Sequence, residues 1–101
     1  WIPHTTAAIT INEHDPDLWA DILSTLRRLV PVEGEYRHNS KYRWMPGEQN
    51  AHAHILGSLM KPDVTVPLEG GRIQLGTWQS ILFIELDGPR SRNIRVTVLG
   101  E

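Results

Sequence analysis

Five histidines in 101 residues are the main chemical signal of this sequence. The imidazole group titrates near neutral pH, and its ring nitrogens bind metal ions and exchange protons. A cluster of such side chains beside a carboxylate therefore predicts a site that binds a metal ion or a phosphate and transfers protons. The candidate members are His4, His38 and His54, with Glu13 or Glu85. The alternative interpretation is that these histidines are scattered over the surface or satisfied by separate hydrogen bonds.

The spacing of His52 and His54 decides which of the two can join such a site. In a helix, residues two apart point roughly 200° away from each other, so only one of them can face a ligand. Asn50 and His54 are four residues apart and share a helical face, so we place both in the candidate site. In a strand the two histidines would instead share a face and form a metal-binding pair.

Arginine supplies most of the positive charge, since 8 of the 10 basic residues are arginines. The planar guanidinium group is well suited to phosphate and carboxylate. Arg90 and Arg92 fall on a predicted turn between strands, where they either clamp a phosphate or lie solvated. Gln79 stands at the start of a predicted buried strand, where it either contacts a substrate or belongs to the strand framework.

Length and composition limit the classes of protein to consider. A chain of 101 residues with 40% hydrophobic and 22% charged residues predicts a single folded domain, residues 1–101. The formal net charge of −2 gives no general field for nucleic acid or an anionic membrane, so we expect neither as a partner. The absence of cysteine excludes disulfides and thiolate zinc sites and favours a cytoplasmic location. No apolar run approaches the ~20 residues of a membrane span.

The elements that must position these residues alternate between helix and strand. The expected elements are a strand at 7–12, a helix at 16–30, a long loop at 31–49, a helix at 50–60, a hairpin of 64–68 with 72–75, a central strand at 78–86 and a final strand at 94–99. This order predicts an α+β fold: a mostly antiparallel, β-sandwich-like sheet with two helices packed on it.

The first helix has the clearest signals. Asp15 is a good N-cap, Pro16 suits the first helical position, and Pro31 stops the helix. Leucine and isoleucine recur between them at helical spacing. Leu26 lies in the middle of this stripe, so burial there predicts that Leu26→Ala costs about 2 to 5 kcal/mol.

Five short motifs stand in order across nearly the whole chain. They are His4 to Ala8, Asn12-Glu13 followed by Asp15 to Asp17, Asn50 to His54 with Gly57-Ser58, Gly76 to Gln79, and Glu85 to Arg90. In this combination the sequence resembles the YjbQ family of small proteins, known as secondary thiamine-phosphate synthases.

The resemblance implies an α+β fold with a β-sandwich-like core, a homotrimer, and pockets near the subunit boundaries. It also implies a weak ability to join hydroxymethylpyrimidine diphosphate to thiazole phosphate, so the partner we expect is a small phosphorylated metabolite. Family members usually carry roughly 30 more residues before the His-Thr-Thr motif, so we expect this chain to lack the N-terminal strands of the family.

Residue roles follow from matching this chemistry to the motifs. The predicted catalytic residues are His4, Glu13 and His54; the predicted substrate or anion contacts are Asn50, Gln79, Arg90 and Arg92; the predicted metal ligands are His4, His38 and His54. Diphosphate favours Mg²⁺ with oxygen ligands, whereas three histidines favour Zn²⁺, so both ions stay open. The competing hypothesis is a non-catalytic trimer that binds a small anionic metabolite or a metal ion.

Overall fold

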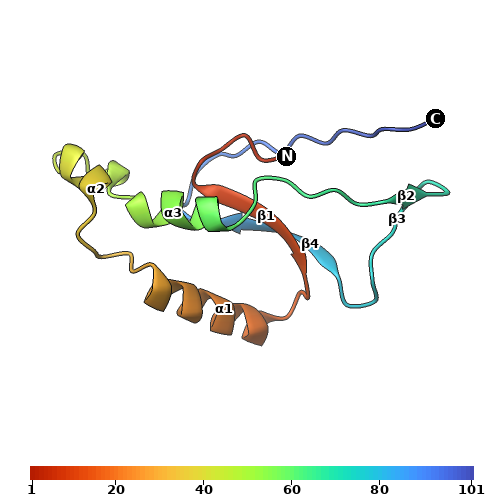
Figure 1. The fold of residues 1–101 in the computed structure, drawn as a ribbon, viewed down its shortest axis with the longest axis horizontal. Helices are drawn as coiled ribbons and strands as arrows, with labels where there is room; N and C mark the ends of the chain where they lie inside the picture. Colours follow the sequence, from red (N-terminus) through yellow and green to blue (C-terminus); the bar gives the residue numbers. More distant parts are fainter.

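The computed structural model describes residues 1–101 and has an α+β fold, as predicted. In chain order the elements are β1 (Ala7–Asn12), α1 (Pro16–Leu29), α2 (Arg37–Lys41), the 3₁₀ helix η1 (Pro46–Glu48), α3 (Ala51–Leu59), β2 (Leu68–Glu69), β3 (Arg72–Ile73) and β4 (Ser80–Glu85) (Figure 1). No helix has both the length and the apolar character needed to cross a membrane.

The antiparallel pair of β1 and β4 forms the centre of the molecule (Figure 1). Ala7 lies opposite Glu85 at one end of the pair, and Asn12 lies opposite Ser80 at the other. The short strands β2 and β3 form a separate hairpin, so the strands make two antiparallel pairs rather than one continuous sheet. The register of β1 against β4 therefore decides which loop residues meet at each end.

The small core lies on one face of β1. Ile2, Ala7 and Ile9 form its buried cluster, with Val64 packed against them. The Ile9 N–H donates to the Lys61 carbonyl at 2.9 Å, so the segment after α3 runs along the free edge of β1. Burial of β-branched side chains on one strand face thus brings the start of the chain beside the end of α3.

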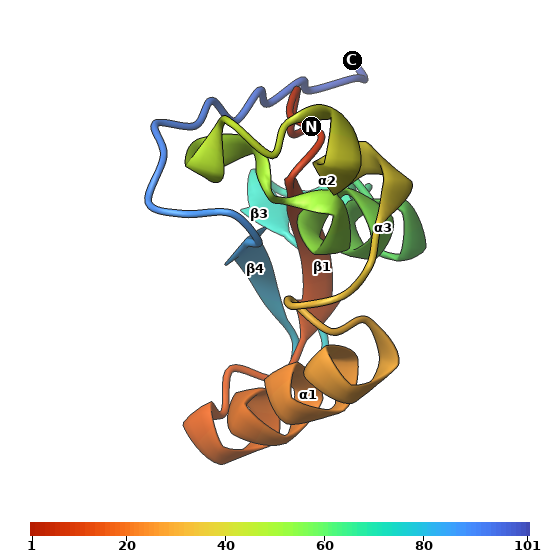
Figure 2. The same ribbon diagram turned by 90° about the vertical axis from the view of Figure 1, so that its left-hand side faces the viewer.

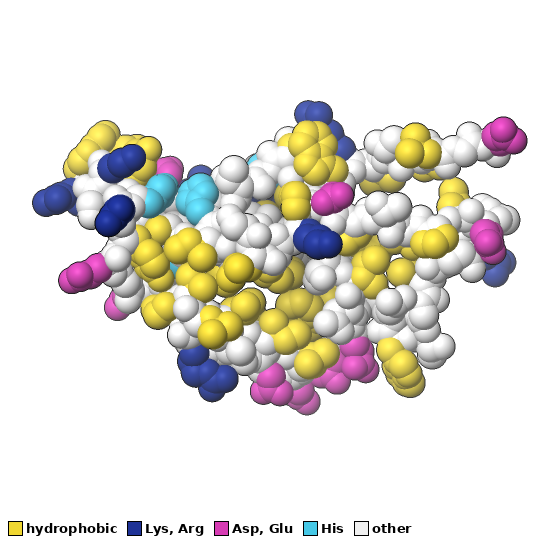
Figure 3. Space-filling view, viewed as in Figure 1, with side chains coloured by type: hydrophobic (Ala, Val, Ile, Leu, Met, Phe, Trp, Pro, Cys, Tyr) yellow, Lys and Arg dark blue, Asp and Glu magenta, His cyan; other side chains and the backbone are white.

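The rest of the chain is spread out around this core. Only 11 of 101 residues are buried, and the radius of gyration is 16.0 Å. A compact domain of this length has a radius of gyration of about 13 Å. Apolar side chains are visible over much of the surface (Figure 3). The structure thus leaves an unusual amount of apolar surface in contact with solvent.

The helix α1 begins and ends close to the predicted positions. The Asp15 Oδ1 accepts hydrogen bonds from the Asp17 and Leu18 N–H groups at 2.8 and 3.1 Å, and Pro16 is the first helical residue. The helix lies beyond the strand pair, away from α2 and α3 (Figure 2). None of its residues is buried, and Leu26 is only half-buried. The predicted burial of Leu26 is therefore only partial.

The segment predicted as a loop at 31–49 contains α2 and η1. Gln49 holds it together, because its Nε2 donates to the carbonyls of Asn39 and Tyr42 at 3.1 and 2.5 Å. Hydrogen bonds from a side chain to backbone groups thus order this segment, although its sequence shows no hydrophobic period. A prediction based on hydrophobic period therefore misses these short helices.

Three of the strand predictions differ from the structure. The predicted central strand at 78–86 is β4, which pairs with β1 alone and leaves Ile81 and Phe83 39% and 38% exposed. The hairpin at 64–75 is reduced to two residues on each side, and 94–99 forms no strand. Near the start of this last segment, Trp1 and Arg95 exchange two backbone hydrogen bonds of 2.7 and 2.9 Å. Beyond them the residues Val96 and Leu99 are 83% and 88% exposed. A β-strand needs a partner for its backbone groups, and the pattern of 94–99 alone does not provide one.

Candidate functional site

A pocket of about 500 Å³ opens at the end of the strand pair where Ala7 faces Glu85. Four segments form its wall: the chain before β1, η1 with the start of α3, Pro62 after α3, and the turn after β4. Its polar lining residues include His4, Thr6, Glu48, Asn50, His54, Arg90 and Arg92. The antiparallel register brings these segments together, since the Leu86 N–H after β4 donates to the Thr6 carbonyl before β1 at 3.2 Å.

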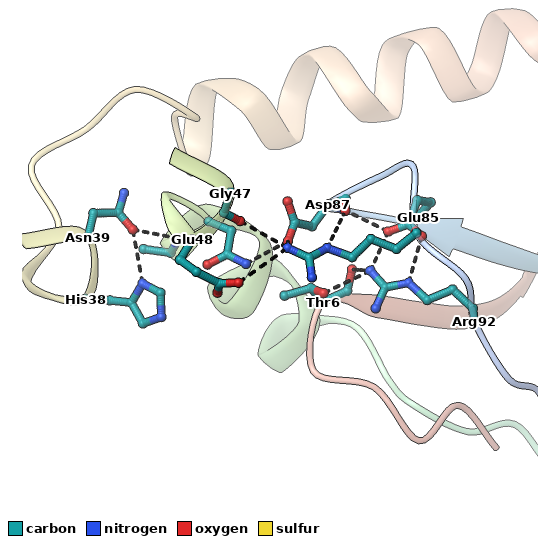
Figure 4. Close-up of polar contacts among 11 residues, drawn as sticks. Thr6, His38, Asn39, Gly47, Glu48, Glu85, Asp87 and Arg92 are labelled. Atoms are coloured by element: carbon teal, nitrogen blue, oxygen red, sulfur yellow. Dashed lines mark hydrogen bonds and ion pairs between the residues drawn. The ribbon is translucent and has the colours of Figure 1, made fainter. Parts of the chain in front are cut away.

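Arg92 forms the most extensive polar contacts of the pocket (Figure 4). Its Nε and Nη2 donate to the two carboxylate oxygens of Glu85 at 2.7 and 2.6 Å. Nη2 also donates to the carbonyl and the hydroxyl of Thr6 at 3.1 and 2.9 Å. The hydrogen bonds from Arg92 lower the pKa of Glu85 to about 2, and the same contact raises the pKa of Arg92. The pair is therefore fully charged at neutral pH and ties β4 to the start of β1.

Arg90 links the turn after β4 to η1. Its Nη2 lies 2.9 Å from Asp87 Oδ2 and donates to the Gly47 carbonyl at 3.0 Å, while Glu48 Oε1 lies 3.8 Å away. Its Nε donates to the Asp87 carbonyl. The Nη1 groups of Arg90 and Arg92 take part in none of the hydrogen bonds of the chain. Both arginines are thus fixed in place and keep donors for an anion.

Asn50 occupies the N-cap position of α3 but does not cap the helix with its side chain. The N–H of Ala51, the first residue of the helix, donates to Asn39 Oδ1 at 3.0 Å. The Asn50 Nδ2 donates to Asp87 Oδ2 at 2.6 Å, and the residue is 4% exposed. Its Oδ1 is buried and has no hydrogen-bond partner. The Asn50 side chain therefore ties the start of α3 to the turn after β4.

The three candidate histidines do not form one cluster: His38 and His54 lie side by side, His4 stands apart from them, and His38 is not among the residues that line the pocket. The ring centroids of His38 and His54 lie 4.8 Å apart, and His38 Nδ1 lies 3.1 Å from Asn39 Oδ1. His4 Nε2 accepts a hydrogen bond from the Asn93 N–H at 2.8 Å. An accepting Nε2 places the proton of the neutral ring on Nδ1. His54 lines the pocket and His52 does not.

The structure does not gather the three predicted histidine ligands around one point. It contains no group of three or more histidine, aspartate or glutamate side chains that could hold a metal ion. The Asn93 N–H already occupies the Nε2 lone pair of His4, which leaves His38 and His54 as the adjacent pair. Two imidazoles alone fall short of the three protein ligands of a typical catalytic zinc site.

Glu13 and Gln79 lie at the opposite end of the strand pair, near Asn12 and Ser80. Six strand residues at about 3.3 Å each span ~20 Å, so neither side chain belongs to this pocket. The Glu13 carbonyl accepts a hydrogen bond from Trp19 Nε1, and Gln79 Oε1 accepts one from the Gly76 N–H. Both residues stabilise local turns in this chain, and their predicted convergence with the histidines is not seen.

Four residues of the site were not predicted from the sequence: Thr6, Asn39, Glu48 and Asp87. Asp87 had a signal, because a carboxylate that follows a strand and precedes an arginine by three residues often forms a fixed ion pair. Asn39 had none, since its role depends on a helix that begins twelve residues later in the chain.

Comparison with known proteins gives one consistent result. The family described as "UPF0047 protein YjbQ-like" matches residues 1–101. A UPF0047 protein of Methanothermobacter thermautotrophicus is 47% identical over 98 residues, which make up 97% of this chain and 64% of that protein. The UPF0047 protein YugU of Bacillus subtilis is 41% identical over 101 residues, with 99% of this chain and 71% of that protein covered.

Solved structures agree with the sequence matches. A crystal structure from Clostridium acetobutylicum, described as an uncharacterized conserved protein of the YjbQ/UPF0047 family, matches with a TM-score of 0.78 and 47% identity. The match covers 91% of this chain and 66% of the chain in that crystal structure. The structure of the hypothetical protein APE1520 of Aeropyrum pernix matches with a TM-score of 0.81 and 43% identity. That match covers 91% of this chain and 64% of the APE1520 chain. The chain thus spans about two thirds of the length of these relatives.

Proposed function

Because this chain belongs to the YjbQ-like UPF0047 family, we propose that its pocket binds a small phosphorylated metabolite and joins hydroxymethylpyrimidine diphosphate to thiazole phosphate. The observation that supports this proposal is the pair of anchored arginines. Arg90 and Arg92 line the pocket with His4, His54 and a single carboxylate, that of Glu48. A volume of about 500 Å³ lies within the usual range of small-molecule sites.

The proposed reaction forms one bond and breaks one bond. The thiazole nitrogen attacks the methylene carbon of the pyrimidine, and the bond from that carbon to the diphosphate oxygen breaks. The electron pair leaves with the diphosphate, and the thiazole ring becomes a thiazolium cation. No proton has to move, so the main task of the site is to stabilise the leaving anion.

The side chains of the pocket suit this task in two ways. The unengaged Nη1 groups of Arg90 and Arg92 supply charged donors for the phosphate oxygens. Carboxylates already hold both guanidinium groups, so little side-chain entropy is lost when the anion binds. His4 Nδ1 and the ring of His54 add hydrogen-bonding groups to the same wall.

Mg²⁺ enters this proposal as part of the substrate. Diphosphate binds Mg²⁺ through its own oxygens, and proteins add one or two carboxylates to such an ion. Glu48 is the carboxylate among the lining residues. We therefore expect EDTA to suppress diphosphate release and Mg²⁺ to restore it. Release that is unchanged by EDTA would remove the ion from the proposal.

A second candidate function is binding without turnover. Arg90 and Arg92 are already paired with Asp87 and Glu85, and this partial neutralisation suits reversible binding of a small anion. The catalytic and the binding proposals differ in one measurement, the release of diphosphate when both precursors are present.

The test is a diphosphate-release assay with both precursors on the unaltered chain and on two matched histidine variants. We expect release above the enzyme-free background, a loss of more than tenfold in His54→Ala, and little change in His52→Ala. Circular dichroism confirms that both variants are folded. Binding of the precursors without release would favour the second candidate. Equal losses in the two variants would contradict the placement of the site at His54.

A further inference from the structure

Trp1 is the large apolar side chain that the pocket exposes. Two apolar residues other than proline line the pocket; Ile2 is 1% exposed and belongs to the buried core, whereas Trp1 is 51% exposed. The indole takes part in neither of the aromatic pairs of the chain. Accessible apolar surface beside convergent polar groups is typical of a site for a small molecule. The indole of Trp1 is thus within reach of a ligand and has no aromatic partner of its own.

Two backbone hydrogen bonds and one guanidinium group hold Trp1 in place. Its amino group donates to the Arg95 carbonyl at 2.7 Å, and the Arg95 N–H donates to the Trp1 carbonyl at 2.9 Å. The guanidinium carbon of Arg95 lies over the indole, 5.2 Å from the ring centroid, which is within the range of a cation–π contact. Because Arg95 covers one face of the indole, a flat ring that stacks on Trp1 uses the opposite face. A side chain held in this way loses little conformational freedom when a ligand binds.

The segment that follows β4 connects Trp1 with the arginine end of the pocket. Arg92 bonds to Thr6 at one end of this segment, and Arg95 pairs with Trp1 at the other. The chain between the two arginines therefore runs alongside the first six residues in the opposite direction. Five extended residues span at most ~17 Å, which limits the distance between Trp1 and Thr6. A phosphorylated heterocycle has one charged end and one flat end, and the two ends of this strip suit them in turn.

We infer that Trp1 is the stacking platform for the heterocyclic ring of the phosphorylated ligand. This inference rests on the proposed function, in which Arg90 and Arg92 bind the phosphate groups. Stacking needs only a flat π surface on the ligand, so Trp1 favours heteroaromatic phosphates over phosphates of sugars or open-chain compounds. The arginines recognise phosphate whatever group carries it. Trp1 therefore supplies a selectivity that the anion site alone does not have.

The test measures binding by calorimetry with two probes, hydroxymethylpyrimidine diphosphate and inorganic diphosphate. In Trp1→Leu we expect the affinity for the pyrimidine probe to fall about tenfold and the affinity for inorganic diphosphate to stay within twofold. Trp1→Phe keeps a flat ring and should lose less than threefold for either probe. Trp78→Leu is the matched control, because Trp78 is 74% exposed and does not line the pocket. It should leave both affinities unchanged.

Tryptophan fluorescence gives a second measurement that needs no altered pocket. We expect saturation of the unaltered chain with the pyrimidine probe to change the fluorescence. The change should persist in Trp78→Leu and disappear in Trp1→Leu. Bound pyrimidine that leaves the fluorescence of the unaltered chain as it was would overturn the inference even if Trp1→Leu failed to fold.

The outcomes separate this inference from the proposed function. Unchanged affinity for the pyrimidine probe in Trp1→Leu would overturn the role of Trp1 and leave the anion site in place. Equal weakening of both probes in Trp1→Leu would also overturn it, because Trp1 would then support the shape of the pocket rather than the ring. Failure of both probes to bind the unaltered chain would overturn both proposals.

Discussion

The ion pair of Arg92 and Glu85 makes the stability of this fold sensitive to acid. The side chains are 10% and 28% exposed, and their closest nitrogen and oxygen atoms lie 2.6 Å apart. The contact lowers the pKa of Glu85 from 4.5 to about 2. Because the folded pKa lies below the unfolded value, the pair stabilises the fold above pH 4.5, and this stabilisation is lost as the pH falls towards 2.

The expected magnitude follows from this difference in pKa. At about 1.4 kcal/mol per pKa unit, the full effect is ~3 kcal/mol. Glu85 is partly exposed and water screens the pair, so we expect about 1 to 2 kcal/mol. Arg92 stays charged throughout this range and adds no pH dependence of its own. In Arg92→Gln the pKa of Glu85 returns towards its ordinary value, and the acid sensitivity of this pair disappears.

The assay is urea unfolding of the unaltered chain and Arg92→Gln at several pH values. Between pH 6 and pH 3 we expect the unaltered chain to lose about 1 kcal/mol more in the free energy of unfolding than the variant. Arg72→Gln is the matched control, since Arg72 is exposed and forms none of the ion pairs. The same loss of stability in Arg92→Gln and the unaltered chain would refute the reasoning.

Three further predictions concern packing and assembly. In Gly57→Ala the new Cβ would lie 2.7 Å from the Thr5 carbonyl oxygen, so urea unfolding should show a loss of about 1 to 3 kcal/mol, whereas Gly47→Ala meets nothing within 4 Å and should cost less. Leu26→Ala removes a half-buried side chain and should cost about 1 to 2 kcal/mol; a loss above 3 kcal/mol would mean that α1 is covered in solution. The exposed apolar side chains favour association, and we expect light scattering to give the mass of a homotrimer; a monomer mass at micromolar concentration would contradict this expectation.

Local signals in the sequence determined several elements of this protein. Asp15 and Pro16 set the start of α1, the β-branched run at 7–12 formed β1, and the apolar spacing of 50–60 placed α3 to within two residues. The spacing of Asn50 and His54 also identified the face of α3 that lines the pocket. These features were predictable because capping and periodicity depend on residues within a few positions of each other.

Tertiary structure alone decided which of the candidate residues meet. The register of β1 against β4 placed Arg92 beside Glu85 and Thr6, and it placed Glu13 and Gln79 at the opposite end of the strand pair. A shift along the strands would change these neighbours without altering any local signal. Register depends on burial and on hydrogen bonds between segments far apart in the chain, and the order of residues within one segment contains neither.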